Sequence, residues 1–175
     1  GSHIQEKLSH TLDEVRRLSS ISQKLLLLSQ ADAGKLRLHH EPFALSQTLT
    51  DIAEDAQMLA PTLTINTDIM PNIIINADAV LLRQALQNLI TNAIKYNIEN
   101  GWVKITVKQI ANNIVIGINN SSHGLSIEAS KNLFERFYRG DASHNRQVEG
   151  FGLGLSLTQE IIKAHGGALT LSINK

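Results

Sequence analysis

The sequence has no cysteine, no long apolar run and no excess of charge of either sign. Without cysteine there is no disulfide, no thiolate zinc site and no cysteine nucleophile, which agrees with a reducing compartment. Because 16 basic residues balance 16 acidic ones, non-specific binding to nucleic acid is disfavoured. The apolar run Leu25 to Leu28 is far shorter than the roughly 18 to 20 residues that span a bilayer. We therefore expect neither a nucleic-acid partner nor direct membrane contact.

The N-terminal part of the chain predicts one long helix. We expect residues 1–3 to be the remnant of a cleaved purification tag. The helix should end near Gly34, a residue type that accepts the left-handed conformation at helix ends. Its apolar stripe requires a partner, which is a missing helix, another protomer or the chain's own domain. The stripe consists of Leu8, Leu12, Val15, Leu18, Ile21, Leu25 and Leu28.

The rest of the chain interleaves helices with short strands, which predicts helices laid on one face of a mixed sheet. Residues 119–152 are rich in Ser, Gly, His and charge and predict a mobile loop or lid. The predicted helices cover 46–61 with Ser46 as N-cap, 78–96 and 153–165. The predicted strands cover 63–69, 73–75, 102–110, 114–118 and 168–173. The buried face of the 78–96 helix should contain Leu82, Ala85, Leu86, Leu89, Ala93 and Ile94.

The clearest chemical signal is the glycine-rich segment Gly150 to Leu155, with glycines at 150, 152 and 154. Glycines that open an amphipathic helix let backbone amides approach an anion at the positive end of the helix dipole. The segment is not a Rossmann or Walker motif, because neither the preceding strand nor the following Lys and Ser/Thr is present. It predicts a phosphate site, with a flexible loop entering a helix as the alternative.

The second signal is a polar patch on the 78–96 helix, where Asn88, Asn92 and Lys95 fall on one side at spacings of four and three. An asparagine carbonyl suits Mg²⁺, which takes one or two protein ligands together with phosphates and waters. Lys95 offers a point charge to the same phosphates. A polar face on an otherwise buried helix is the alternative for any single asparagine.

From about Leu8 to its end, the chain resembles the sensor histidine kinases, both in its motifs and in the order of those motifs. Asn88 to Tyr96 is similar to the family's N box, Leu133 to Arg139 to its F box, and Gly150 to Leu155 to its second glycine box. The resemblance implies an α+β fold, a two-layer α/β sandwich of the histidine-kinase and gyrase ATPase type. Its sheet is mixed and mostly antiparallel, helices cover one face, and a long N-terminal helix precedes it.

The resemblance implies binding of ATP and Mg²⁺, with Asn92 ligating the metal and Lys95 and Tyr96 lining the nucleotide. Gly152, Leu153 and Gly154 would wrap its phosphates. The nucleotide contacts implied are Asn92, Lys95, Tyr96, Asn120, Gly124, Leu125, Gly150, Gly152, Leu153, Gly154 and Leu155. The catalytic residues implied are Asn88, Asn92, Lys95 and Arg139.

The resemblance also implies how the chain is organised and what it meets. Residues 4–40 would be part of a dimerisation helix, and residues 41–175 the catalytic ATP-binding domain. The partners would be its own dimerisation helix or a second protomer, and the receiver domain of a response regulator. The chain would be a cytoplasmic domain of a membrane-bound bacterial sensor. His10 does not match the family's acceptor pattern, so the phosphoryl-accepting histidine would lie on another helix.

The first glycine box departs from the family. Aligned on Gly124, the family's Asp-x-Gly-x-Gly has Asn120 in place of the adenine-binding aspartate and Ser122 in place of the first glycine. An asparagine can donate or accept, so it discriminates less against a 6-oxo purine than an aspartate does. This departure supports an alternative, a degenerate nucleotide-binding or scaffold domain without catalysis.

Asn88 helps to distinguish phosphoryl transfer from ATP hydrolysis. Related ATPases of this fold, such as DNA gyrase, place a glutamate there to activate water, whereas an amide has no usable proton affinity. Asn88 therefore favours phosphoryl transfer to a separate nucleophile, and a hydrolysing ATPase is the disfavoured third hypothesis.

Overall fold

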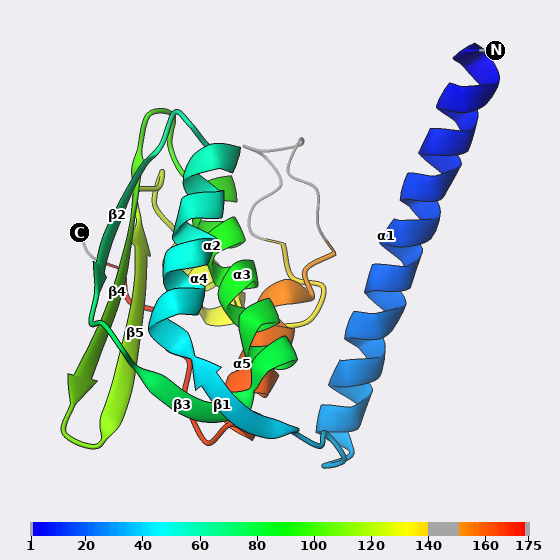
Figure 1. Cartoon of the computed structure of the whole chain (residues 1–175). Helices are drawn as coiled ribbons and strands as arrows, with labels where there is room; N and C mark the ends of the chain where they lie inside the picture. The colour runs from blue at the N-terminus through cyan, green and yellow to red at the C-terminus, as the bar shows by residue number, and fades with distance from the viewer. Residues whose placement is uncertain (1, 140–150, 174–175) are drawn as a thin grey trace. The chain divides into compact units, whose positions relative to one another are not determined.

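The computed structural model describes residues 2–139 and 151–173. The chain consists of two compact units, with the boundary between Leu36 and Arg37. The first unit consists mainly of helix α1 (Ser2–Asp32), drawn in blue in Figure 1. The predicted N-terminal helix and its end are confirmed, because Gly34 follows with a φ of +64°. No helix among the described residues is both long and apolar enough to cross a membrane.

Helix α2 (Leu45–Leu59) begins one residue earlier than expected, and the prediction that Ser46 is its N-cap is wrong. The Ser46 hydroxyl instead donates to the Met70 carbonyl oxygen at 2.7 Å and accepts from the Ile73 N–H at 2.9 Å. It satisfies backbone groups in the turn between two strands, which a hydroxyl at the helix start can reach only through the tertiary fold.

Within the described residues, five strands form two sheets. Strands β1 (His40–Ala44) and β3 (Ile74–Asp78) pair antiparallel. Strand β4 (Trp102–Ile110) lies between β2 (Thr64–Ile69), which is parallel to it, and β5 (Asn113–Asn120), which is antiparallel. The predicted mixed sheet and hairpin are therefore confirmed. Strand β1 was not predicted, because only one of its five side chains is buried and no alternation marks it.

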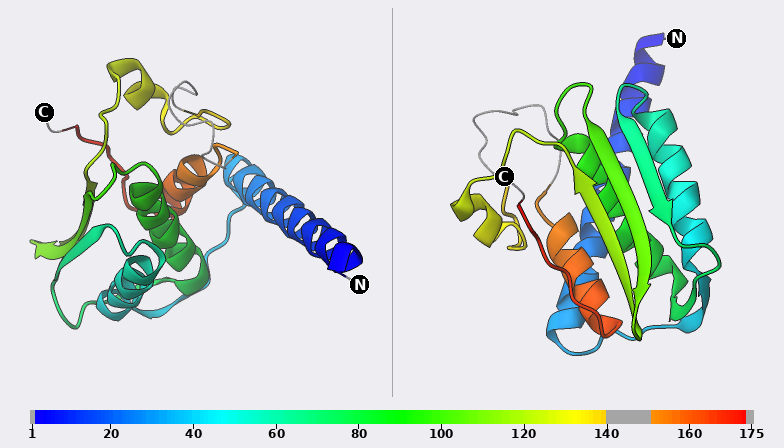
Figure 2. Two further views of the ribbon diagram at one scale, coloured as in Figure 1. Left: turned by 90° about the horizontal axis from the view of Figure 1, so that it is seen from above. Right: turned by 90° about the vertical axis from the view of Figure 1, so that its left-hand side faces the viewer.

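Helices α2, α3 (Ala79–Lys95) and α5 (Gly154–Ala164) lie on one face of the three-stranded sheet (Figures 1 and 2). The predicted buried face of α3 is partly wrong, since Leu89 and Ile94 are half-buried whereas Ile90 is almost fully buried. The residues at the centre of this core include Leu45, Leu49, Leu86, Ile90, Val103, Ile105 and Val107.

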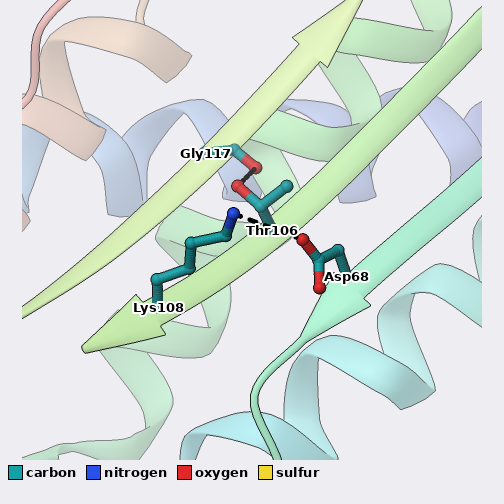
Figure 3. A network of polar contacts seen from close by, with 4 residues as sticks. All are labelled: Asp68, Thr106, Lys108 and Gly117. Carbon is teal, nitrogen blue, oxygen red and sulfur yellow. Dashed lines mark hydrogen bonds and ion pairs between the residues drawn. The ribbon is translucent and has the colours of Figure 1, made fainter. Parts of the chain in front are cut away.

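The opposite face of the sheet is largely exposed and carries both polar and apolar side chains. The Lys108 ammonium lies 3.4 Å from the Asp68 carboxylate, and the Thr106 hydroxyl donates to the Gly117 carbonyl oxygen at 3.5 Å (Figure 3). Because both charged side chains are mostly in water, this ion pair adds little to stability.

Two segments near the chain's end differ from their predicted structure. The described part of the predicted loop at 119–152 contains a short helix, α4 (Ile127–Asn132), whose first turn is capped by the Ser126 hydroxyl, and residues 140–150 of the predicted lid lie outside the described residues. The predicted strand at 168–173 is wrong, because no strand is formed there within the described residues. Alternating apolar residues are not sufficient for a strand, which also requires a ladder of hydrogen bonds with a neighbour.

Candidate functional site

The N-terminal end of α3 is fixed by Asp78, which is 9% exposed. Its carboxylate accepts hydrogen bonds from the Leu81 N–H at 3.0 Å and from the His39 N–H at 2.9 Å. Burial raises the pKa of Asp78, but the hydrogen bonds from the backbone N–H groups of Leu81 and His39 outweigh it, so the pKa lies below its ordinary value. Asp78 is therefore ionised at neutral pH and serves as a strong cap.

His165 joins the C-terminal end of α5 to the start of α3. Its Nε2 accepts from the Asp78 N–H at 3.0 Å, and its Nδ1 lies 2.7 Å from the Ile161 carbonyl oxygen. Because Nε2 accepts from a backbone N–H, Nδ1 is the donor to the Ile161 carbonyl oxygen.

Asn88 joins the middle of α3 to the first turns of α5. Its Nδ2 donates to the Thr158 hydroxyl at 3.0 Å, and Thr158 is almost fully buried. A Cβ on Gly154 would overlap the Asn88 side chain, so only glycine allows this close approach. Two segments that lie more than 60 residues apart in the sequence, the predicted N box and second glycine box, therefore meet here.

The glycine turn before α5 also contacts the segment after α4. Gly152 has a φ of +66°, and a Cβ there would come within 2.6 Å of the Tyr138 carbonyl oxygen and 2.7 Å of the Phe137 carbonyl carbon. The Phe137 N–H donates to the Gly152 carbonyl oxygen at 2.9 Å. Leu153 is buried and Leu155 half-buried. The turn is thus held between α5 and the segment that resembles the F box.

Asn92, Lys95 and Tyr96 follow one another at the C-terminal end of α3. The Lys95 ammonium lies 5.8 Å from the centre of the Tyr96 ring. The half-buried side-chain amide of Asn92 has no hydrogen-bond partner among the described residues. Its oxygen is a neutral hard donor of the type that Mg²⁺ accepts. Residues 2–139 and 151–173 contain no group of three or more His, Cys, Asp or Glu side chains that could hold a metal ion.

The end of β5 is tied to the same end of α3. The Ser121 hydroxyl donates to the Asn97 Oδ1 at 2.6 Å and accepts from the Trp102 N–H at 2.8 Å. The Asn97 Nδ2 in turn donates to the Ala93 carbonyl oxygen at 3.1 Å. Asn120 is the neighbour of Ser121, so the first glycine box and the end of the N box lie close together.

The structure thus brings together the polar side of α3, the start of α5 and the end of β5. Gly124 has a φ of +92° in the loop after β5, where Leu125 is half-buried, and Arg139 is exposed. Gly150 lies outside the described residues. The positioning residues Asp78, His165, Thr158, Asn97 and Ser121 have no motif that marks them, and only the N-cap preference of Asp78 was a local signal.

Residues 77–175 match the family described as histidine kinase-, DNA gyrase B- and HSP90-like ATPases. The chain belongs to this ATPase family. Over 169 residues it is 35% identical to the probable sensor protein PcoS of Escherichia coli, covering 97% of this chain and 36% of PcoS. The chain therefore spans only about a third of the length of such relatives.

Solved structures agree with this ATPase family. The histidine kinase AdeS of Acinetobacter baumannii superposes with a TM-score of 0.69 at 28% identity, over 87% of this chain and 70% of that chain. The ATP-binding domain of PrrB from Mycobacterium tuberculosis superposes with a TM-score of 0.57 at 26% identity, over 74% of this chain and 83% of that chain. The predicted α+β fold is therefore confirmed.

Proposed function

We propose that this chain is the catalytic part of a sensor histidine kinase, which binds Mg-ATP and transfers its γ-phosphoryl group to a histidine in two-component signalling. The observation that carries the proposal is the hydrogen bond between Asn88 on α3 and Thr158 on α5, which unites the polar patch with the glycine turn. The similarity to PcoS and AdeS supports a kinase rather than another member of the family.

The transfer requires positioning and charge stabilisation more than acid–base chemistry. The attacking imidazole nitrogen forms a bond to the γ-phosphorus, the bond to the β,γ-bridging oxygen breaks, and ADP leaves with that electron pair. Asn88 is unsuited to activate water, because an amide is not a base at neutral pH and its Nδ2 already donates to Thr158. Lys95 would attract the phosphates, and Arg139 would be a further cation.

Asn92 would hold Mg²⁺ through its side-chain oxygen. When bound, the ion neutralises phosphate charge as it develops. The chain's own contribution is a preorganised amide on a rigid helix whose far end is fixed by Asp78 and His165. Tyr96 would line the nucleotide beside Lys95, and Asn120 would face the 6-position of the purine.

Helix α1 would be the second helix of a dimerisation domain. Leu8, Leu12, Val15 and Leu18 on its predicted stripe are each at least half exposed. Exposed apolar stripes of this kind are covered by partner helices. The acceptor histidine would lie on such a partner helix, and the receiver domain of a response regulator would take the phosphoryl group from it.

Calorimetric titration with Mg-ATP tests the site. We expect the chain to bind Mg-ATP and Asn92→Ala to weaken binding about 100-fold or more, because a protein ligand of the metal is lost. Asn66→Ala is the matched control, since Asn66 is exposed on β2. Equal affinity in the chain and Asn92→Ala would contradict the metal role, and no binding would favour a scaffold.

Transfer is tested by adding γ-labelled ATP and the dimerisation domain of a histidine kinase relative. Acid-labile label on its histidine would support the kinase assignment. Binding without label would favour the alternative of a degenerate nucleotide sensor, which the departures at Asn120 and Ser122 motivate. Release of inorganic phosphate without an acceptor would instead indicate a hydrolase.

A further inference from the structure

The turn between α3 and β4 contains Asn100, the only asparagine in the sequence that is followed by glycine. The Gly101 N–H donates to the Ile98 carbonyl oxygen at 3.2 Å, which closes a four-residue turn. Asn100 takes the third position of this turn with a φ of +53°. A positive φ there is characteristic of a type II turn, and asparagine adopts it more readily than most residues with a side chain. The backbone of the turn therefore favours asparagine at position 100.

Position 101 requires glycine for a separate reason. A Cβ on Gly101 would overlap both the Asn97 Oδ1 and the Ser121 hydroxyl oxygen. The Ser121 hydroxyl donates to that Oδ1 at 2.6 Å and accepts from the Trp102 N–H at 2.8 Å, so neither atom can move aside without breaking these bonds. Two independent requirements of the fold thus place an asparagine directly before a glycine.

An asparagine followed by glycine can react with the backbone in water. The Gly101 nitrogen gives up its proton and forms a bond to the Asn100 Cγ. The Cγ–Nδ2 bond breaks, and its nitrogen leaves with that electron pair and takes up a proton, as ammonia. Water then adds to either carbonyl of the five-membered succinimide ring and opens it to aspartate or isoaspartate. Glycine permits the ring closure because it has no Cβ to obstruct the attack.

The Asn100 side chain is available for this reaction. It is exposed and forms no hydrogen bond within the described part of the chain. Ring closure requires the Gly101 N–H to leave the Ile98 carbonyl oxygen. Hydrogen bonds in exposed turns open in local fluctuations while the core stays folded. The turn's own hydrogen bond is therefore what the described structure sets against the attack.

Asn97, in the same segment, is held in the opposite way. Its Nδ2 donates to the carbonyl oxygens of Ala93 and Trp102. Its Oδ1 accepts from the Ser121 hydroxyl and from the Ile98 N–H. The attacking nitrogen would here be that of Ile98, which is branched at Cβ and already bonded. Asn97 is thus a matched internal control with both ends of its amide engaged.

We propose that Asn100 is a covalent modification site, which converts to aspartate and isoaspartate by reaction with the Gly101 nitrogen and water. Isoaspartate routes the main chain through the former side chain, so the backbone gains a methylene group immediately before Gly101. Because Gly101 packs closely against Asn97 and Ser121, the longer backbone would disturb the network that joins α3, β4 and β5. The inference is independent of the proposed kinase function, since it rests on the covalent chemistry of the turn.

Incubation of the whole chain at mildly alkaline pH tests the proposal, with tryptic digestion and mass spectrometry of samples taken over time. Trypsin cleaves after Lys95 and Lys104, so residues 96–104 form one peptide that contains both Asn97 and Asn100. We expect the amide-to-acid mass change at Asn100 to be at least about tenfold faster than at Asn97, because Asn97 must first give up several hydrogen bonds. Equal rates, or no change at Asn100, would overturn the proposal.

Variants test the site itself. Asn100→Gly keeps a residue that adopts positive φ and removes the reacting amide, so the peptide should change no faster than Asn97 allows. Asn66→Ala on β2 leaves the turn intact and should react at the original rate. A mass change in Asn100→Gly as fast as in the original chain would contradict the assignment.

The consequence for the fold is measured by thermal unfolding. The aged chain, enriched in isoaspartate by ion exchange on its added negative charge, should unfold about 3 °C or more below Asn100→Asp. That variant has the added charge without the longer backbone, so the comparison isolates the methylene group. Equal unfolding temperatures would overturn the effect on the network around Gly101.

Discussion

The two ends of helix α3 differ in how their polar groups are satisfied. At the N-terminal end, Asp78 uses its N–H and both carboxylate oxygens in bonds to His165, Leu81 and His39. At the C-terminal end, the Asn92 amide has no partner within the described part of the chain. One end is bonded from three segments, whereas at the other end Asn97 bonds to Ser121 and Trp102 and the Asn92 amide is left without a described partner.

This difference indicates that one end of α3 anchors the helix and that the other end would bind a ligand. A polar side chain without a protein partner can bind a ligand only if the backbone beneath it is held by other contacts. Asp78 and His165 hold α3 and α5 together at the ends away from the glycine turn. We therefore expect substitutions at the N-terminal end of α3, the anchored end, to change stability more than nucleotide affinity. Substitutions at the C-terminal end, the open end, should change nucleotide affinity more than stability.

Gly152→Ala should have the largest effect. It would be an exception to the comparison of the two ends, because Gly152 lies near the open end and its substitution should nevertheless reduce stability. We expect the free energy of unfolding to fall by about 2–4 kcal/mol, since positive φ and overlap with backbone atoms combine. Gly166→Ala is the control, because Gly166 has a φ of +77° but open space around its Cα. Chemical denaturation of both variants should show a clearly smaller loss for Gly166→Ala.

Asp78→Ala tests the anchored end. We expect a loss of about 2–3 kcal/mol in the free energy of unfolding, because the cap is removed and the His39 N–H loses its acceptor. Mg-ATP affinity of the folded variant should change by less than about threefold. Ser126→Ala, which removes only the cap of the short helix α4, should cost less. A large loss of affinity with unchanged stability would reverse the comparison.

Asp78→Asn tests the same end of α3 through the pH dependence of stability. Because the folded pKa is below the ordinary value, the ionised carboxylate stabilises the fold above the unfolded pKa, about 3.9, and this contribution disappears as pH falls through the folded pKa. At neutral pH we expect Asp78→Asn to be about 1.5 kcal/mol less stable. Urea unfolding from pH 7 to pH 2.5 should show the difference shrinking; a constant difference would exclude this origin.

Thr158→Val should have the smallest effect. It keeps the volume and removes the hydroxyl that accepts from Asn88, so we expect about 1 kcal/mol of destabilisation and about fivefold weaker Mg-ATP binding. Thr106→Val on the exposed sheet face is the control and should leave the affinity unchanged. Equal affinities for the two variants would show that the orientation of Asn88 does not matter for binding.

Periodicity and turn chemistry in the sequence predict most of the elements. The alternation from Trp102 to Ile118 predicts the hairpin, and the apolar spacing after Asp78 predicts α3, because neither pattern depends on distant residues. Strand β1 and the chain after Gly167 were predicted incorrectly. Pairing with β3 makes β1 a strand, and the absence of a described pairing partner leaves 168–173 without strand structure.

In the candidate site, too, some residues were predicted from the sequence and others were not. Asn88, Asn92, Lys95 and the glycines before α5 were predicted from residue type and spacing along one segment. The groups that position them were not, since Thr158, His165 and Ser121 are common residue types whose partners lie 19 to 87 positions away.

By itself, the sequence determined the long helices and the hairpin of β4 and β5, and which segments bear groups suited to a metal, phosphates or a purine. Only the tertiary structure decided that Ser46 bridges a turn, that Nε2 of His165 accepts from the start of α3, and that Asn88 donates to Thr158. Local propensity depends on neighbours along the chain, whereas the donor or acceptor role of a histidine or amide depends on whichever group folding places beside it.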